Sequence, residues 1–385
     1  MSESVRLVTG AGRTGHGADP KDVQMTRFRM PALSRLAVAA VASLAVAASV
    51  FAPAASGAPA RSADRPEYVA LGDSYSAGVF VRPWDDSDGC GRSYRNYPHQ
   101  VAERFGYRLR DVTCGAAEVV DGILEPQPSD KILGPPTVPP EGGWPELPAQ
   151  LEALSADTDV VTVGIGGNSL GFGTILAKCL ELGLTQPLKS KPCTDHYTGS
   201  GAGAPWLADR FAQLDADFGR MMRAIHAAAP HARVAVVGYP AIVPDNSGCT
   251  FLHWNQLGSV KKGDMPWLDG LEQRLNDLLR RHSGHQNAAY VDTYGPSVGH
   301  GVCRSGDAKW MYGIRDNLTG DGDQTDPPTE LCDDIPGSGE ACTLVHPNAR
   351  GLDNQAREVA KVLQHDGGTP PGRLTPAGLT PPDRR

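Results

Sequence analysis

Ser74 stands where a side-chain hydroxyl could act as a nucleophile. It lies in "YVALGDSYSAG" (68–78), where a short apolar run ends at Gly72. If a helix begins near Ser74, its first N–H groups are unpaired and its positive potential faces the hydroxyl. The N–H of Ser74 could then stabilise an oxyanion formed when its hydroxyl attacks an acyl carbon. Taken alone, Gly-Asp-Ser is more simply explained by Asp73 or Ser74 capping the helix.

Two further glycine-containing turns offer hydrogen-bond donors. "GIGGN" (164–168) follows a β-branched run, and Asn168 adds a side-chain amide to the glycine backbone. Its spacing is not Gly-x-Gly-x-x-Gly and no suitable acid follows, so it does not predict a dinucleotide site. "CGAA" (114–117) is a turn of small residues with backbone N–H groups available.

His346, in "LVHPNARG", precedes a predicted helix and is a candidate general base. A single histidine among the 11 in the chain is more often structural or merely exposed. His346 is therefore a candidate only if its position in the fold brings it to the other site residues. Ligands of open α/β sheets bind beyond the carboxyl ends of the strands. We therefore expect the strand ends that carry these turns to form the site.

The elements that must position these residues alternate between strand and helix patterns. Strands are predicted within 67–74, 108–116, 159–169, 232–240 and 288–295. Helices are predicted over 96–106, 206–229, 266–282 and 346–364. This alternation predicts a three-layer α/β/α sandwich with a central, mainly parallel sheet.

The two ends of the chain differ from this pattern. Within residues 1–60, a basic lead, the apolar stretch 36–52 and the small residues 56–60 are typical of a secretory signal peptide that is removed. A single membrane anchor is the alternative. We expect one domain over 61–366 and a disordered Pro/Gly-rich tail over 367–385. The formal charge of −8 argues against a nucleic-acid partner.

The eight cysteines all follow residue 60, and an even number in an exported chain suggests disulfides. Pairing of sequence neighbours is the simplest of about 105 connectivities. The pairs would be Cys90–Cys114, Cys179–Cys193, Cys249–Cys303 and Cys332–Cys342. A zinc site is disfavoured because no Cys-x-x-Cys occurs.

The order of these pieces resembles the GDSL family of the SGNH hydrolases, in particular its secreted, disulfide-bonded bacterial esterases and lipases. The resemblance runs from about residue 66 to about residue 364. It implies a flavodoxin-like strand order, with Ser74 as nucleophile and His346 as base. It also implies an oxyanion hole made by Asn168 and the N–H groups of Ser74 and of Gly115 or Ala116.

The sequence departs from this family in the second motif. Family members often read Cys-x-Gly-Ala, whereas this chain reads Cys114-Gly115-Ala116-Ala117. Counting from the cysteine puts Ala116 in the glycine position, where its N–H serves if the local φ is negative. Gly115 remains the other candidate.

The other departure precedes His346. Many relatives have Asp three residues before the histidine, where this chain has Thr343. The resemblance therefore implies a Ser–His dyad in which the carbonyl of Thr343 orients the imidazole. A carboxylate from Asp292, Asp333 or Asp334 is the competing interpretation.

The resemblance implies a secreted, extracellular serine ester hydrolase that cleaves fatty-acyl esters through an acyl-enzyme, without metal or organic cofactor. A phospholipase A-type or carbohydrate acetyl esterase activity is the alternative on the same site, and an inactive secreted binding protein is the non-enzyme alternative. We expect a monomer with an ester or lipid substrate, no nucleic acid and no stable membrane anchor.

Candidate pocket aromatics are Trp84, Trp144, Trp267 and Trp310. His300 is read as structural, and "DGD" within 321–342 is weak evidence for calcium.

Overall fold

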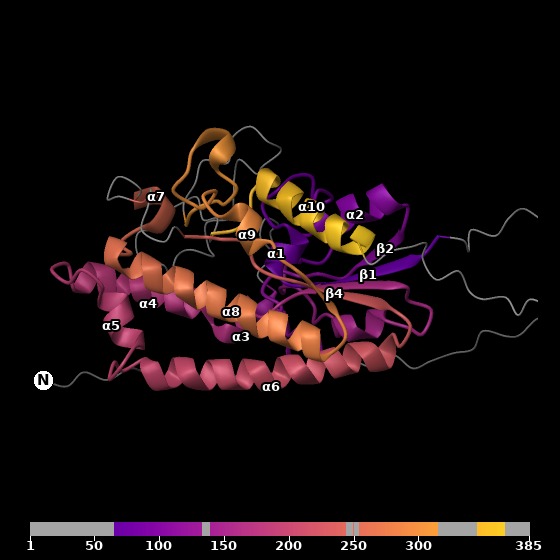
Figure 1. The fold of residues 1–385 in the computed structure, drawn as a ribbon, viewed down its shortest axis with the longest axis horizontal. Helices are drawn as coiled ribbons and strands as arrows, with labels where there is room; N and C mark the ends of the chain where they lie inside the picture. Colours follow the sequence, from indigo (N-terminus) through magenta and orange to yellow (C-terminus); the bar gives the residue numbers. More distant parts are fainter. Residues whose placement is uncertain (1–64, 133–138, 244–248, 250–253, 315–344, 366–385) are drawn as a thin grey trace, which may run out of the picture. The chain divides into compact units, whose positions relative to one another are not determined.

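The computed structural model describes residues 65–132, 139–243, 249, 254–314 and 345–365 (Figure 1). Several sequence predictions fall outside these residues: the leader, the Cys332–Cys342 pair, the segment 321–342 and the tail. Thr343, Asp333 and Asp334 also lie outside them.

The core of the fold is a five-stranded sheet in the order β2-β1-β3-β4-β5, with every neighbouring pair parallel. The strands are β1 (Glu67–Gly72), β2 (Arg108–Asp111), β3 (Val160–Gly164), β4 (Arg233–Val237) and β5 (Ala289–Val291). The predicted α/β class and flavodoxin-like order are therefore confirmed. Each strand is shorter than its predicted segment, because pairing stops where the chain turns into the loops of the site.

Helices cover both faces of this sheet. On one face α2 (Tyr97–Phe105) packs beside α10 (Ala349–His365), and on the other α6 (Ala204–Ala228) packs beside α8 (Met265–His285) (Figure 1). Strand alternation explains this division. Tyr68 belongs to the hydrophobic cluster under α2 and α10, whereas Val69 belongs to the larger cluster under α6 and α8.

The remaining helices are short, apart from one. They are α1 (Ser74–Ala77), α3 (Gly167–Leu170), α4 (Phe172–Thr185), α5 (Pro192–Tyr197), α7 (Trp254–Leu257) and α9 (Tyr294–Ser297), with 3₁₀ turns at Ser129–Lys131, Gln150–Ala153, Lys262–Asp264 and Gly306–Ala308. The sequence analysis did not predict α4. This helix follows the "GIGGN" turn, and no side chain caps its first turn. Within the described ranges, no helix is both long and apolar enough to cross a membrane.

Within the described residues, three disulfides join neighbouring cysteines of the sequence, as predicted. They are Cys90–Cys114, Cys179–Cys193 and Cys249–Cys303. The first fastens the "CGAA" turn after β2 to the loop that precedes α2, and the second joins α4 to α5. Cross-links of this kind stabilise mainly by restricting the unfolded chain.

Close packing at the carboxyl ends of β1 and β3 depends on two glycines. Gly72 and Gly164 are register partners, and Ser76 of α1 lies against both. A Cβ built on Gly72 would lie 2.6 Å from the Gly164 carbonyl oxygen and 2.4 Å from Ser76 Oγ. Neither position has room for a side chain, so α1 can turn tightly over the sheet edge.

Gly72→Ala should therefore destabilise the protein by several kcal/mol, because the new methyl group meets backbone that cannot move aside. Gly270→Ala is the matched control. Gly270 lies in α8, and a Cβ there has no neighbour within 4 Å, so this change should stabilise by about 0.5–1 kcal/mol. Urea denaturation measures both. Equal stabilities for the two variants would contradict the packing argument.

Candidate active site

The side chains of Ser74 and His346 meet. Ser74 Oγ lies 2.7 Å from His346 Nε2, although the two residues are 272 positions apart in the chain. Ser74 is the first residue of α1, directly beyond β1, and His346 lies in the loop that leads into α10. The distance is that of a hydrogen bond between a hydroxyl and an imidazole nitrogen.

Capping of α1 is carried out by Asp73, not by Ser74. The Asp73 carboxylate accepts the Tyr75 N–H at 2.9 Å, and the Asp73 N–H donates to the Gly164 carbonyl. These bonds hold the start of α1 on the end of β3. The Ser74 hydroxyl is therefore left to face the imidazole.

His346 is held by a backbone turn of unusual conformation. Val345, directly before it, has φ +56°, which a β-branched residue rarely adopts. The Tyr75 hydroxyl donates to the Val345 carbonyl at 2.6 Å, and the Val345 N–H donates to Gly313. The Tyr75 ring also packs against the imidazole, with 5.0 Å between ring centroids. The sequence analysis missed this role of Tyr75; its only signal was an aromatic residue beside Ser74.

The backbone donors of the site differ in availability. The Gly115 N–H already donates to the Cys90 carbonyl at 3.0 Å. Within the described part of the chain, neither the Ser74 nor the Ala116 N–H has an acceptor. Of the two residues predicted in the second motif, Ala116 is therefore the one whose N–H is free.

Ala116 has φ +60°, not the negative φ that we took as the condition for its role. Hydrogen bonds hold the turn in this form on both sides of Ala116: the Gly115 carbonyl accepts from Gln127 at 2.8 Å, and the Ala117 carbonyl accepts from Asn168 at 2.9 Å. Alanine in this conformation costs about 1–2 kcal/mol. A glycine would avoid that cost, which fits the glycine expected at this position.

Asn168 lies in α3, beyond β3, and lines the same cavity as Ser74 and His346. Its Nδ2 donates to the Ala117 carbonyl at 2.9 Å, which orients the amide. The second Nδ2 hydrogen has no acceptor among the described residues. Asn168 therefore joins the "GIGGN" turn to the "CGAA" turn and keeps one amide hydrogen available as a donor.

The cavity beside Ser74 has a volume of about 120 Å³ and is mainly apolar. Its apolar lining consists of Leu170, Phe172, Leu176, Ile242, Leu271 and Leu275. The four tryptophans proposed from the sequence are not among the described lining residues. Two of them form stacks elsewhere, Trp267 on Tyr197 and Trp310 on His300.

Three buried polar side chains also reach this cavity: Asp73, Tyr239 and Glu272. The Tyr239 hydroxyl accepts the Gly167 N–H at 2.8 Å and donates to Asp73 Oδ2, so it joins α3 to α1. Burial raises the pKa of Asp73 to about 7, although the hydrogen bonds from Tyr239 and the α1 backbone act in the opposite direction. Burial also raises the pKa of Glu272 well above its usual value.

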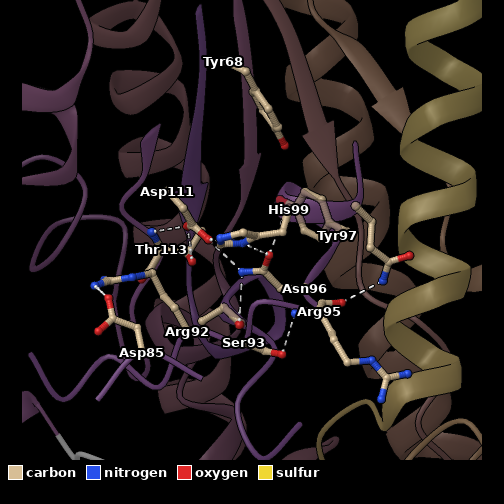
Figure 2. Close-up of polar contacts among 12 residues, drawn as sticks. Tyr68, Asp85, Arg92, Ser93, Arg95, Asn96, Tyr97, His99, Asp111 and Thr113 are labelled. Carbon is tan, nitrogen blue, oxygen red and sulfur yellow. Dashed lines mark hydrogen bonds and ion pairs between the residues drawn. The ribbon is translucent and has the colours of Figure 1, made fainter. Parts of the chain in front are cut away.

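A polar network that includes Asn96, His99 and Asp111 (Figure 2) contacts the end of α1. Asn96 Nδ2 donates to the Ala77 carbonyl at 3.2 Å and to Asp111 Oδ2 at 2.7 Å. His99 Nδ1 lies 2.8 Å from Asn96 Oδ1, and burial lowers the pKa of the imidazole. These contacts fix the last residue of α1 and explain why Asn96 and Asp111 are buried or nearly so.

The competing carboxylate that the structure describes is exposed. Asp292 accepts the Gly295 N–H at 3.0 Å, and within the described ranges no hydrogen bond joins it to His346. His300 stacks on Trp310, and its Nδ1 lies 2.9 Å from the Ala308 carbonyl oxygen, which agrees with a structural role. Among all the residues that the structure describes, no three His, Cys, Asp or Glu side chains are grouped so that they could hold a metal ion.

Known proteins resemble this chain over most of its length. The model of the GDSL-like lipase/acylhydrolase family matches residues 70–353. Lipase 2 of Streptomyces coelicolor is 33% identical over 339 residues, which cover 87% of this chain and 99% of that protein. An esterase of Streptomyces scabiei is 31% identical over 360 residues, covering 87% of this chain and 95% of that protein.

Two solved structures share the fold. They are phospholipase A1 from Streptomyces albidoflavus NA297 and an extracellular lipase from Streptomyces rimosus, each 23% identical with a TM-score of 0.52. The first matches 79% of this chain and all of that chain; the second matches 78% and 99%. The family match to residues 70–353 and the likeness to lipase 2 show that the chain belongs to the GDSL-like lipase/acylhydrolase family and is a carboxylic ester hydrolase.

Proposed function

We propose that the protein is a secreted lipase or esterase that cleaves fatty-acyl esters through an acyl-enzyme on Ser74, with His346 as the base. The observation that carries this proposal is the 2.7 Å contact between Ser74 Oγ and His346 Nε2 at the edge of an apolar cavity. The apolar lining supports an acyl chain as the group that it receives.

In the first half of the reaction His346 Nε2 takes the proton of Ser74 as the hydroxyl oxygen attacks the ester carbonyl. Negative charge develops on the carbonyl oxygen. The N–H groups of Ser74 and Ala116 and the second Nδ2 hydrogen of Asn168 stabilise this charge, and each such donor contributes about 3 kcal/mol.

In the second half the protonated imidazole gives its proton to the leaving alcohol. Water then enters, His346 takes a proton from it, and the hydroxide attacks the acyl-enzyme carbonyl. Collapse of this second intermediate returns the proton to Ser74 Oγ and releases the acid. The same three donors act in both steps.

We infer that the imidazole works in a dyad. The Thr343 carbonyl would accept the Nδ1 hydrogen of His346 and fix the tautomer that leaves Nε2 as the base. The exposed position of Asp292 supports this choice over that carboxylate. Asp333 and Asp334 remain the competing carboxylates.

A phospholipase A-type activity is the second candidate, because one of the solved structures that share this fold is a phospholipase A1. An apolar cavity suits the acyl chain of either substrate. Secretion is supported by the three disulfides and by the likeness to an extracellular lipase.

Ser74→Ala should lower kcat/KM for p-nitrophenyl esters by at least about 10³-fold, because the nucleophile is lost. Asn168→Ala should lower kcat by about 10²–10³-fold with little change in KM, since its donor acts on the transition state. Steady-state hydrolysis of butyrate, octanoate and palmitate esters measures both variants and the chain-length preference. Wild-type rates in Ser74→Ala would remove the proposed mechanism.

Thr343→Ala should leave kcat within about threefold of wild type, because the backbone carbonyl that orients His346 is retained. Asp333→Asn and Asp334→Asn are the matched controls and should be equally active. A loss of 10²-fold or more in either Asn variant, with unchanged thermal stability, would show that this carboxylate, and not the Thr343 carbonyl, orients His346.

The raised pKa of Asp73 predicts how stability depends on pH. The folded state keeps this proton up to about pH 7, whereas the unfolded chain loses it near pH 4. Between these values the folded state binds more protons, so this contribution to the unfolding free energy falls as pH rises. Asp73→Asn cannot titrate but can still cap α1.

The unfolding free energy of wild type minus that of Asp73→Asn should therefore fall by about 2–4 kcal/mol from pH 4 to pH 7 and then level off. Urea denaturation across this range measures the difference. A difference that rises with pH would mean that the hydrogen bond from Tyr239 outweighs burial.

A further inference from the structure

Glu272 presents a carboxyl oxygen that nothing in the mechanism above uses. It lies on α8, is 4% exposed and lines the same cavity as Ser74 and His346. Glu272 Oε2 accepts the Ile242 N–H at 3.1 Å. Oε1 is buried and has no hydrogen-bond partner among the described residues.

The surroundings of Glu272 favour an uncharged carboxyl. Its neighbours Leu271, Leu275 and Ile242 also line the cavity, and no Lys or Arg is among the described lining residues. The nearby charge of Asp269 adds to the effect of burial in raising the pKa of Glu272. Both oxygens of Asp269 are themselves occupied, by Tyr294 and Gln273.

An uncharged carboxyl can both donate and accept a hydrogen bond, and it gains little from a cationic partner. A plain hydrocarbon substrate would fill the cavity but leave Glu272 Oε1 unpaired, which is unfavourable for a buried polar atom. A substrate hydroxyl would satisfy it, since a hydroxyl also donates and accepts. A neutral ligand is further favoured by the apolar walls around the carboxyl.

We propose that Glu272 is a specificity-determining residue, whose Oε1 hydrogen-bonds a hydroxyl group of the substrate near the ester that Ser74 attacks. The proposal rests on the proposed function and narrows its substrates to hydroxyl-bearing esters. That hydroxyl can belong to the alcohol, as in a glycerol monoester, or to the acyl chain, as in a hydroxyacyl ester.

Two matched substrate pairs separate these sources. The first pair is glycerol monobutyrate and its di-O-methyl ether. The second is p-nitrophenyl 3-hydroxybutyrate and p-nitrophenyl butyrate. The measured quantity is the ratio of kcat/KM within each pair, for the wild type, Glu272→Leu and Glu272→Gln.

In the wild type the hydroxylated member of one pair should be preferred by about 10-fold or more, because its partner leaves the carboxyl oxygen unpaired. Glu272→Leu should bring that ratio to about one, because the partner of the substrate hydroxyl is lost. Glu272→Gln should retain most of the preference, since an amide can accept the Ile242 N–H and still offer a donor.

Ratios near one in wild type for both pairs would overturn the proposal even if no variant folded, and so would a preference that survives Glu272→Leu. A purely structural role would lower both members of each pair alike and leave the ratio unchanged. Preference for a choline ester over its 3,3-dimethylbutyl analogue, lost in Glu272→Gln, would assign a charged carboxylate instead. In each of these outcomes the wild type should still hydrolyse p-nitrophenyl butyrate and Ser74→Ala should not. The proposal for Glu272 would then have failed while the proposed function stands.

Discussion

Parallel pairing of β2, β1 and β3 is the constraint on which the site depends. The three strands are adjacent and run in the same direction, so their carboxyl ends share one edge of the sheet. The turn after each strand brings one part of the site: Ala116 after β2, Ser74 after β1 and Asn168 after β3. Residues from three distant segments thereby form one cluster without any need for a long loop.

Hydrogen bonds between these turns fix their relative positions. The Asp73 N–H reaches the end of β3, the Asn168 amide reaches the turn after β2, and Tyr239 joins Asp73 to Gly167. Only the imidazole comes from outside this edge. It is brought in by the loop before α10, and Tyr75 of α1 holds that loop through the Val345 carbonyl. The imidazole proposed as the base is thus positioned by the same short helix that carries Ser74, the proposed nucleophile.

The cavity combines apolar walls with buried acids, and the two features have different consequences. The leucine side chains, with Ile242 and Phe172, make the walls apolar, as the proposed binding of an acyl chain requires. Asp73 is covered and bonded on both oxygens, so its role is to join elements. Among the described residues, Glu272 accepts a hydrogen bond on Oε2 only, which leaves Oε1 for the substrate hydroxyl that we propose. In our proposal Asp73 therefore holds the site together, whereas Glu272 selects the ligand.

The sequence by itself determined the alternation of strands and long helices, three disulfides between neighbouring cysteines and the candidate residues Ser74, Asn168 and His346. The elements and disulfides could be predicted because apolar periodicity, glycine turns and cysteine spacing are local features of the chain. The candidate residues stood out because their order in the chain resembles that of the GDSL family. Only the tertiary structure decided that Ala116, not Gly115, has an N–H without an acceptor among the described residues, because the Cys90 carbonyl that binds the Gly115 N–H is distant in sequence. It alone showed where Tyr75, Tyr239 and Glu272 lie and what they contact. What these side chains do depends on which atoms pack against them across segments far apart, and no local pattern records that.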